Sequence, residues 1–270
     1  NVLRIFEINA VTLCVKITLI KWKELIWPFQ ENGKDFHQKA VMIIPIYMKI
    51  ETLLIYGNIV QTTTLCRYMK IKLRPYQEKV LRSYQDNRWN IFLAPRQIGK
   101  TITSAIFLAW YLVFHFDKNV LLMSNKGGTT KEIMDKIKAI FEGLPFFLKP
   151  GTLKKDVMTM IFDNKCRIIG QNTTKTGGIG FTIHLLFLDE FAHIQESIKK
   201  PFYENVYPTL SSSKISRVII TSTPNGYDLF HDLYEGAVSN ANEYTPIRVD
   251  WWEVPGRDEE WKKREIANLG

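Results

Sequence analysis

The sequence predicts an α/β fold with a mostly parallel central sheet flanked by helices, plus a small N-terminal subdomain. The first observation is that short apolar runs alternate with segments of helical length from residue 71 onward. Strands that alternate with helices are typical of a parallel sheet covered on both faces. The second observation is the length of 270 residues with 46% hydrophobic content, which suffices for one full α/β core and some additional structure.

Residues 1–70 have the least regular pattern. Charged residues interrupt every apolar run there, at Arg4, Glu7, Lys16, Lys21, Lys49 and Glu51. No run approaches the eighteen or so residues of a membrane span, and there is no signal-peptide pattern. We expect a subdomain of short helices and strands and no membrane association. The chain begins with Asn1 rather than methionine, which favours a fragment of a longer protein.

The first core elements follow in order. The run WNIFLA predicts a strand over 89–94, and after six loop residues the run TITSAIFLAWYLVFHF predicts a largely buried helix over 101–116. NVLLMS predicts a strand over 119–124. An amphipathic pattern then predicts a helix over 130–144, ended by a glycine and a proline.

Three later segments complete the predicted sheet. TMIFDNKCRIIG predicts a hairpin that turns at 163–165, and IHLLFLDE predicts a strand over 183–190. SRVIITSTP predicts a further strand over 216–224. We therefore place the core over residues 71–245 and a C-terminal tail over 246–270.

Charge and cysteine content narrow the classes of partner and environment. The formal net charge of +9 and the pI near 9.3 favour a polyanionic partner. Cys14, Cys66 and Cys166 lie far apart without a CxxC pair, which favours neither a zinc site nor a disulfide framework. Reduced thiols in a cytoplasmic setting fit this pattern.

The string APRQIGKT, residues 94–101, joins a predicted strand to a predicted helix. In that context Gly-Lys-Thr predicts a phosphate-binding loop, whose backbone N–H groups and helix N-terminus point at phosphates. Lys100 would contact the β- and γ-phosphates and the Thr101 hydroxyl would ligate Mg²⁺. This pattern predicts a P-loop NTPase, and the alternative is a helix start of no significance. Ala94 replaces the usual first glycine and Arg96 stands where phosphates should lie.

A pair of carboxylates ends the predicted strand over 183–190. Asp189 would hold Mg²⁺ through its water shell, and Glu190 would accept a proton from the attacking water or orient it. We expect these residues and Lys100 at the ends of adjacent strands. The alternative is two exposed carboxylates at a strand end.

Three motifs in this order and spacing resemble the ATPase half of the terminase large subunit, the motor that packages DNA into tailed-phage heads. They are APRQIGKT, LLFLDEFAHI and TSTPNG, and the resemblance covers residues 71–265. It implies an ATPase that uses ATP and Mg²⁺ to translocate double-stranded viral DNA into a procapsid. It also implies that the tail leads toward a nuclease domain missing from this chain.

The resemblance also implies roles for individual residues. Arg96 would act with Glu190 and Lys100 in catalysis, as an arginine finger in cis, and the alternative is a structural ion-pair partner that holds the loop. Metal binding would fall to Thr101 and Asp189. Nucleotide binding would involve Tyr76 and Gln77 at the adenine, and Pro95, Arg96, Gln97, Ile98, Gly99, Lys100, Thr101 and Ile102 in the loop.

A coupling motif that senses the γ-phosphate is implied at TSTPNG. It would comprise Thr221, Ser222 and Thr223, and the alternative is simply a strand followed by a turn. Relatives often carry an arginine where Ile179 stands, which puts a finger supplied to a neighbouring subunit in doubt.

The partners implied are double-stranded DNA, held through its phosphates without sequence readout, the portal protein and the small terminase subunit. The resemblance further implies a homo-oligomeric ring when active, with a monomer possible in isolation. It implies no membrane partner and a location in the host cytoplasm during virion assembly. No acidic metal cluster of a nuclease is visible, because Asp258, Glu259 and Glu260 are typical of a solvated helix start, so we expect no DNA cleavage.

Two other functions stay open from the sequence. His193 in DEFAH resembles the DEAH boxes of superfamily 2 helicases, but a helicase needs a second motor domain, for which there is no room after residue 230. A regulatory module could hold ATP without hydrolysing it, although such a module has no need of Glu190. His37, His115, His184 and His231 lack ligand spacing and are expected to be structural. Trp251 and Trp252 are expected to pack the tail onto the core.

Overall fold

The computed structural model describes residues 62, 65–66, 69–146, 148–178 and 180–269. The chain divides into two units, Asn1–Thr52 and Leu53–Gly270, and the described residues belong to the second. The subdomain predicted over 1–70 therefore lies almost wholly outside the described residues, as do Cys14 and His37.

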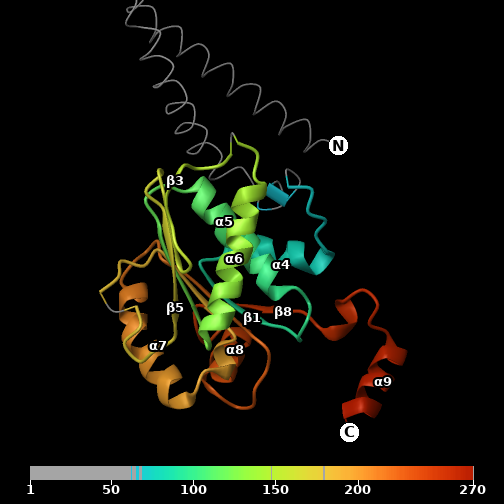
Figure 1. Cartoon of the computed structure of the whole chain (residues 1–270). Coiled ribbons are helices and arrows are strands. Elements are labelled where there is room, and N and C mark those ends of the chain that lie inside the picture. The colour runs from blue at the N-terminus through green and yellow to red at the C-terminus, as the bar shows by residue number, and fades with distance from the viewer. Residues whose placement is uncertain (1–61, 63–64, 67–68, 147, 179, 270) are drawn as a thin grey trace, which may run out of the picture. The chain divides into compact units, whose positions relative to one another are not determined.

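Eight described strands form one sheet in the order β3-β4-β5-β2-β6-β7-β1-β8 (Figure 1). Six of them, from β5 to β8 in that order, run parallel, and β4 pairs antiparallel with both β3 and β5. The strands are β1 (Trp89–Leu93), β2 (Asn119–Ser124), β3 (Thr152–Lys155), β4 (Thr159–Phe162), β5 (Arg167–Asn172), β6 (Leu185–Asp189), β7 (Arg217–Ser222) and β8 (Thr245–Arg248). The mostly parallel α/β sheet predicted from the sequence is confirmed, as is the hairpin of β4 and β5.

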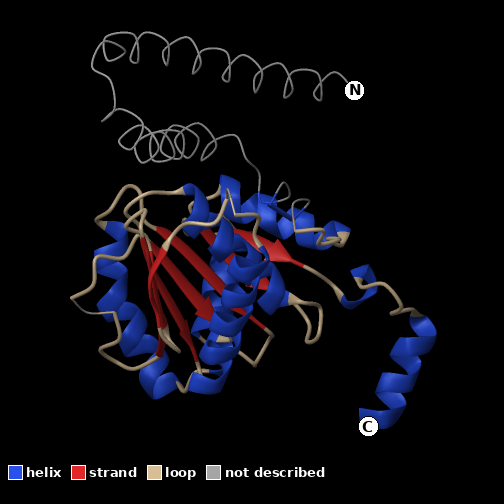
Figure 2. Ribbon diagram, turned by 45° about the horizontal axis from the view of Figure 1, so that its top comes forward, coloured by secondary structure: helices blue, strands red, loops and turns tan. Residues whose placement is uncertain are grey.

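Helices cover both faces of the sheet (Figures 1 and 2). The helices are α4 (Pro75–Asp86), α5 (Lys100–Phe114), α6 (Gly127–Gly143), α7 (Glu196–Ser211), α8 (Leu229–Val238) and α9 (Glu259–Leu269), with 3₁₀ turns η2 (Phe191–His193) and η3 (Trp251–Glu253). Alternate side chains of the central strands enter two separate cores, one under α4, α5 and α6 and the other under α7 and α8. Because successive strand residues point to opposite faces, each central strand contributes to both cores.

The longest buried helix follows the phosphate-loop motif. From Thr103 to Phe114 every side chain of α5 is buried, because α4 and α6 flank it on the sheet. This explains why the sequence shows a nearly continuous apolar run there rather than a one-sided pattern. α5 begins at Lys100, so its N-terminus lies at the carboxyl edge of the sheet.

Some elements were not predicted. β8 extends the sheet to Arg248, past residue 245, where the sequence placed the end of the core. The other domain boundaries stay a prediction. α7 contains Pro201 and Pro208, which remove helix donors and hide the helical pattern. α9 begins at Glu259 with exposed carboxylates, as expected of a solvated helix start.

The packing expected of the tryptophan pair is wrong in part. Trp252 is 57% exposed, and Trp251 stacks on Trp261 of α9 with ring centroids 5.9 Å apart. Ile247, Val249 and Val254 are the tail residues that are buried in the core. Small apolar side chains therefore anchor the tail, because they fit against the sheet without leaving an indole N–H unpaired.

A buried lysine joins the helices on one face. Lys199 of α7 is 2% exposed, and its ammonium pairs with Asp228, which caps the N-terminus of α8. The same ammonium donates to the carbonyl of Ala192 at 3.1 Å. The pair thus holds α7, η2 and α8 together.

Replacing Lys199 with Met is expected to lower the free energy of unfolding by about 3–5 kcal/mol, because Asp228 would be left as an uncompensated, largely buried charge. Urea denaturation measures the change, with Lys200→Met on the exposed side of α7 as the matched control. A Lys199→Met protein as stable as the control would show that the pair does not hold the helices.

Candidate active site

The phosphate-loop motif forms the turn between β1 and α5. Gly99 adopts a left-handed conformation with φ of 83° and caps α5. The positive φ favours glycine, and a Cβ at that position would lie 3.0 Å from Nε2 of Gln77, so that side chain would have to shift slightly. The first N–H groups of α5 are thereby left at the carboxyl edge of the sheet, where they can bind phosphate.

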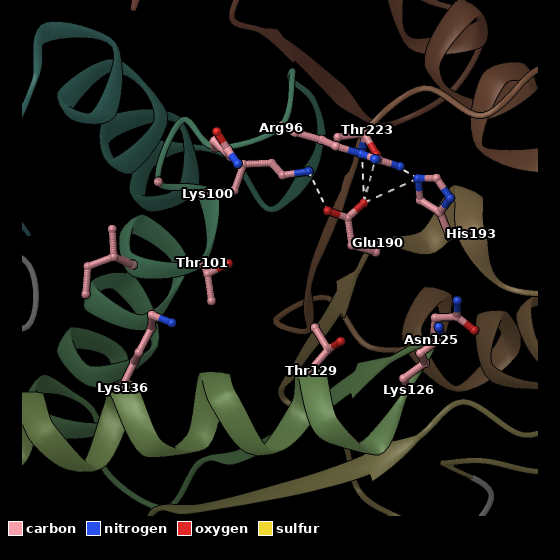
Figure 3. Close-up of a pocket in the computed structure, with 13 residues that line it drawn as sticks. Arg96, Lys100, Thr101, Asn125, Lys126, Thr129, Lys136, Glu190, His193 and Thr223 are labelled. Atoms are coloured by element: carbon pink, nitrogen blue, oxygen red, sulfur yellow. Dashed lines mark hydrogen bonds and ion pairs between the residues drawn. The ribbon is translucent and has the colours of Figure 1, made fainter. Parts of the chain in front are cut away.

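Glu190 lies directly opposite Lys100 (Figure 3). The Lys100 Nζ donates to Oε1 of Glu190 at 2.8 Å, while the backbone N–H and the hydroxyl of Thr223 both donate to Oε2 at 3.1 Å. Glu190 has φ of 50°, a left-handed conformation that is rare outside glycine and is found at functional sites. Both oxygens of this carboxylate are therefore fixed, one by the phosphate loop and one by the end of β7.

The surroundings keep Glu190 ionised. Burial alone would raise the pKa of its carboxyl, but the Lys100 ammonium and the hydrogen bonds from Lys100 and Thr223 outweigh burial and lower the pKa below its usual value. An ionised carboxylate at this position can accept a proton or orient a water molecule.

Asp189 ends β6 and is 3% exposed. Its Oδ1 accepts a hydrogen bond from the Thr221 hydroxyl at 2.6 Å, and burial raises its pKa. A buried carboxylate is more stable as an anion beside a cation. With the hydroxyl of Thr101 in the cleft, the donors are hard oxygens that fit Mg²⁺, which takes one or two carboxylates and keeps its waters. Among the described residues no group of three His, Cys, Asp or Glu forms a closed metal cage, and Mg²⁺ needs none.

Most of the phosphate loop lines a cleft of about 550 Å³, within the range of small-molecule sites, together with Glu190 and Thr223, whereas Asp189 is buried outside its lining. It is lined by Arg96, Gln97, Gly99, Lys100, Thr101, Ile102, Asn125, Lys126, Thr129, Lys136, Glu190, His193 and Thr223. Six predicted loop residues thus lie together with Glu190 and Thr223. The sequence reasoning missed Asn125, Lys126, Thr129 and Lys136, although the first two directly follow the strand over 119–124 at the same edge of the sheet.

Arg96 is exposed in the loop, and its side chain points toward the Thr223 side of the cleft (Figure 3). Its guanidinium has no ion pair or hydrogen bond within the described part of the chain, whereas its carbonyl accepts from Arg257 at 3.0 Å. The structural ion-pair role considered from the sequence therefore finds no acceptor there. The role as an arginine finger stays a prediction.

Tyr76 and Gln77 of α4 are buried behind the loop rather than in the cleft lining. The Tyr76 hydroxyl donates to the carbonyl of Ile98 at 2.7 Å, and Nε2 of Gln77 donates to the hydroxyl of Thr103 at 3.0 Å. Ile98 is itself buried, and like Pro95 it does not line the cleft. Both α4 side chains brace the loop and α5. Contact of these side chains with adenine stays a prediction.

The strand order corrects one expectation. β1 and β6 are not neighbours, because β7 lies between them and carries Thr221 and Ser222, with Thr223 directly after it. Asp189 pairs in register with Thr221, and Leu93 pairs with Ser222. The predicted coupling residues therefore stand between the phosphate loop and the two carboxylates, which is why Thr223 reaches Glu190.

Two other described histidines, His115 and His184, form hydrogen bonds with the backbone away from the cleft. Nδ1 of His115 lies 3.0 Å from the carbonyl of Tyr111, and burial lowers the pKa of His115 to about 4. His184 accepts from the backbone N–H of Asn119 at 3.0 Å. Ile179 lies outside the described residues.

A phosphate loop and a strand-end carboxylate pair on a largely parallel sheet, with one strand between them, define a P-loop NTPase. Residues 91–267 match the family model of the N-terminal part of the terminase large subunit, T4-like-virus type, and the chain belongs to this family.

Solved structures support the same fold. The large terminase ATPase domain of Thermus phage P74-26 is 18% identical and aligns over 74% of this chain and 90% of that one with a TM-score of 0.59. The HK97 bacteriophage large terminase is 14% identical over 78% of this chain, with a TM-score of 0.64. A large terminase from a thermophilic bacteriophage, in complex with ADP, is 16% identical over 72% of this chain, with a TM-score of 0.54. The alignments cover 52% of the HK97 chain and 49% of the chain in the ADP complex, so this chain matches about half of each.

Proposed function

We propose that this chain is the ATP-hydrolysing part of a motor that translocates double-stranded viral DNA into a procapsid. The observation that carries the proposal is the contact between Lys100 and Glu190, with Thr223 holding the second carboxylate oxygen. A phosphate-binding lysine and a general base share one hydrogen bond across the cleft. Phosphate oxygens that enter the loop compete for Lys100 and release Oε1 of Glu190 toward the attacking water.

The other cleft residues bind the phosphates and the metal ion and stabilise the transition state. The loop N–H groups and Lys100 bind the phosphates, and Thr101 and Asp189 would hold Mg²⁺, which neutralises charge on the β- and γ-oxygens when bound. Arg96 stabilises charge that develops on the transferred phosphoryl group. Binding of adenine nucleotide is supported by the ADP complex of the thermophilic-phage relative.

The two alternatives fit less well. A regulatory module that only binds ATP does not need a carboxylate fixed by three donors opposite the phosphate lysine. A superfamily 2 helicase was suggested by His193 alone, whereas membership in the terminase family rests on residues 91–267.

The test of hydrolysis is phosphate release from ATP by the purified chain, with Mg²⁺ and with EDTA. We expect release only with Mg²⁺, and we expect the wild type to bind an ATP analogue more strongly than a Lys100→Met control does. Binding without phosphate release in Mg²⁺ would favour the regulatory module.

The partners proposed are duplex DNA, the portal protein, the small terminase subunit and other copies of this chain in a ring, in the host cytoplasm. The net charge of +9 supports a phosphate-rich partner. In the part of the chain that the structure describes, no helix is long and apolar enough to cross a membrane.

DNA binding is expected to depend on salt and not on sequence. Each phosphate neutralised releases counterions, so log affinity should fall against log salt with a slope of about −0.9 per phosphate. Labelled duplexes of different sequence, titrated at two salt concentrations, measure this. Strong preference for one sequence, or affinity indifferent to salt, would contradict a packaging motor.

A further inference from the structure

The Thr223 hydroxyl lies between two side chains of the loop that follows β6. Its Oγ1 is 3.1 Å from Oε2 of Glu190 and 2.6 Å from Nε2 of His193. Thr223 is 4% exposed, so water does not readily replace either partner. His193 lines the nucleotide cleft, and it has no part in the roles proposed above for the phosphate loop and the two carboxylates.

Counting protons leaves two arrangements of these bonds, which differ in whether Nε2 of His193 carries a proton. A threonine hydroxyl has one proton to donate, and an ionised carboxylate only accepts. If Thr223 donates to Glu190, Nε2 of His193 must carry a proton and donate to Oγ1. If Nε2 carries no proton, the hydroxyl turns toward His193, and Oε2 of Glu190 keeps only the backbone N–H of Thr223.

The backbone around His193 is held independently of its imidazole. The N–H of Ala192 donates to the Ser222 hydroxyl at 3.0 Å, and the carbonyl of Ala192 accepts from Asn225 and from Lys199, each at 3.1 Å. These bonds attach η2 to the end of β7, to the loop after β7 and to α7. The imidazole can therefore be removed without releasing the backbone that carries it.

We propose that His193 is a positioning residue for ATP hydrolysis, which donates from Nε2 to the Thr223 hydroxyl and so directs that hydroxyl onto the Glu190 carboxylate. The inference rests on the proposed function. His193 does not act on the attacking water itself. It acts through Thr223, because its Nε2 is 2.6 Å from that hydroxyl and 3.7 Å from the carboxylate.

The test is a double-mutant cycle of His193→Ala and Thr223→Val, read as kcat and KM for ATP. His193→Ala should lower kcat about 10- to 100-fold, the range for a misplaced catalytic group, with little change in KM. The double variant should be no slower than Thr223→Val alone, because both changes remove one interaction. His193→Gln, which keeps a donor near Nε2, should recover part of kcat, and His231→Ala on α8 is the matched control.

Two outcomes of the kinetic cycle would overturn the inference. One is a His193→Ala enzyme with the kcat of the wild type, and the other is a double variant whose losses multiply, which would mean that His193 acts independently of Thr223. A thermal melt of each variant identifies loss of fold, and if His193→Ala fails to fold, His193→Phe, which fills the space but has no donor, carries the cycle.

The inference and the proposed function fail in different ways. If the wild type releases no phosphate, the proposed function fails, and the imidazole ¹⁵N shifts still test the contact. We expect neutral His193 to carry its proton on Nε2, and the shifts to change in Thr223→Val. A neutral imidazole protonated on Nδ1 would overturn the inference even in an active enzyme.

Discussion

Glu190→Gln should bind ATP nearly as well as the wild type and hydrolyse it at least about 10²-fold more slowly, the lower range for loss of a general base. Gln has the same shape, and its carbonyl can still accept from Thr223, so the cleft should keep its form. The substitution removes the negative charge that accepts the proton. It also removes the ion pair with Lys100, which leaves the ammonium free for phosphate. Phosphate release and titration with a fluorescent ATP analogue measure the two effects separately.

The matched control for this prediction is Glu204→Gln, an exposed glutamate on α7 away from the cleft. It should hydrolyse ATP at the rate of the wild type. Unchanged turnover in Glu190→Gln would remove Glu190 from the mechanism, and a parallel loss of nucleotide binding would make it a structural residue of the loop.

Arg96→Ala should lower kcat by roughly 10³-fold, the lower end for arginine fingers, and raise KM much less. The guanidinium acts on charge that develops in the transition state, so its loss appears in kcat rather than in ground-state binding. The described residues offer its guanidinium no structural partner, which is why a large loss of stability is not expected. Arg96→Lys is the sharper variant, because lysine keeps the charge but lacks the planar fork.

Arg257→Ala is the control for the Arg96 substitutions. Arg257 donates to the carbonyl of Arg96, so its removal perturbs the same loop without touching the guanidinium of Arg96. We expect a kcat close to that of the wild type. An Arg96→Ala protein that melts at a lower temperature but keeps its kcat would instead make Arg96 a structural residue.

Local patterns in the sequence predicted much of the fold. Continuous apolar runs indicate the strands that end at Ser124 and Asp189 and the helix that begins at Lys100. These elements can therefore be predicted without long-range information. α7 was missed because Pro201 and Pro208 break its pattern. The insertion of β7 between β1 and β6 could not be predicted, because strand order depends on packing across the whole sheet.

The site was predictable where its residues are neighbours in the sequence. Lys100 and Thr101 belong to one loop, and Asp189 and Glu190 to one strand end. The contact of His193 with Thr223 joins positions 30 residues apart, and no local pattern indicates it. Lysine is seldom buried, so the burial of Lys199 could not be expected before its partner Asp228 was placed.

ATP hydrolysis by this chain is proposed to drive translocation of duplex DNA. Phosphate release measured with and without double-stranded DNA tests this coupling most directly. The measurement uses saturating ATP and Mg²⁺, duplexes of unrelated sequence, and Glu190→Gln as the inactive control. We predict a slow basal rate that rises with every duplex, loses this stimulation as salt is raised, and is abolished in Glu190→Gln. A rate that ignores DNA at low salt, or stimulation by one sequence alone, would contradict a packaging motor.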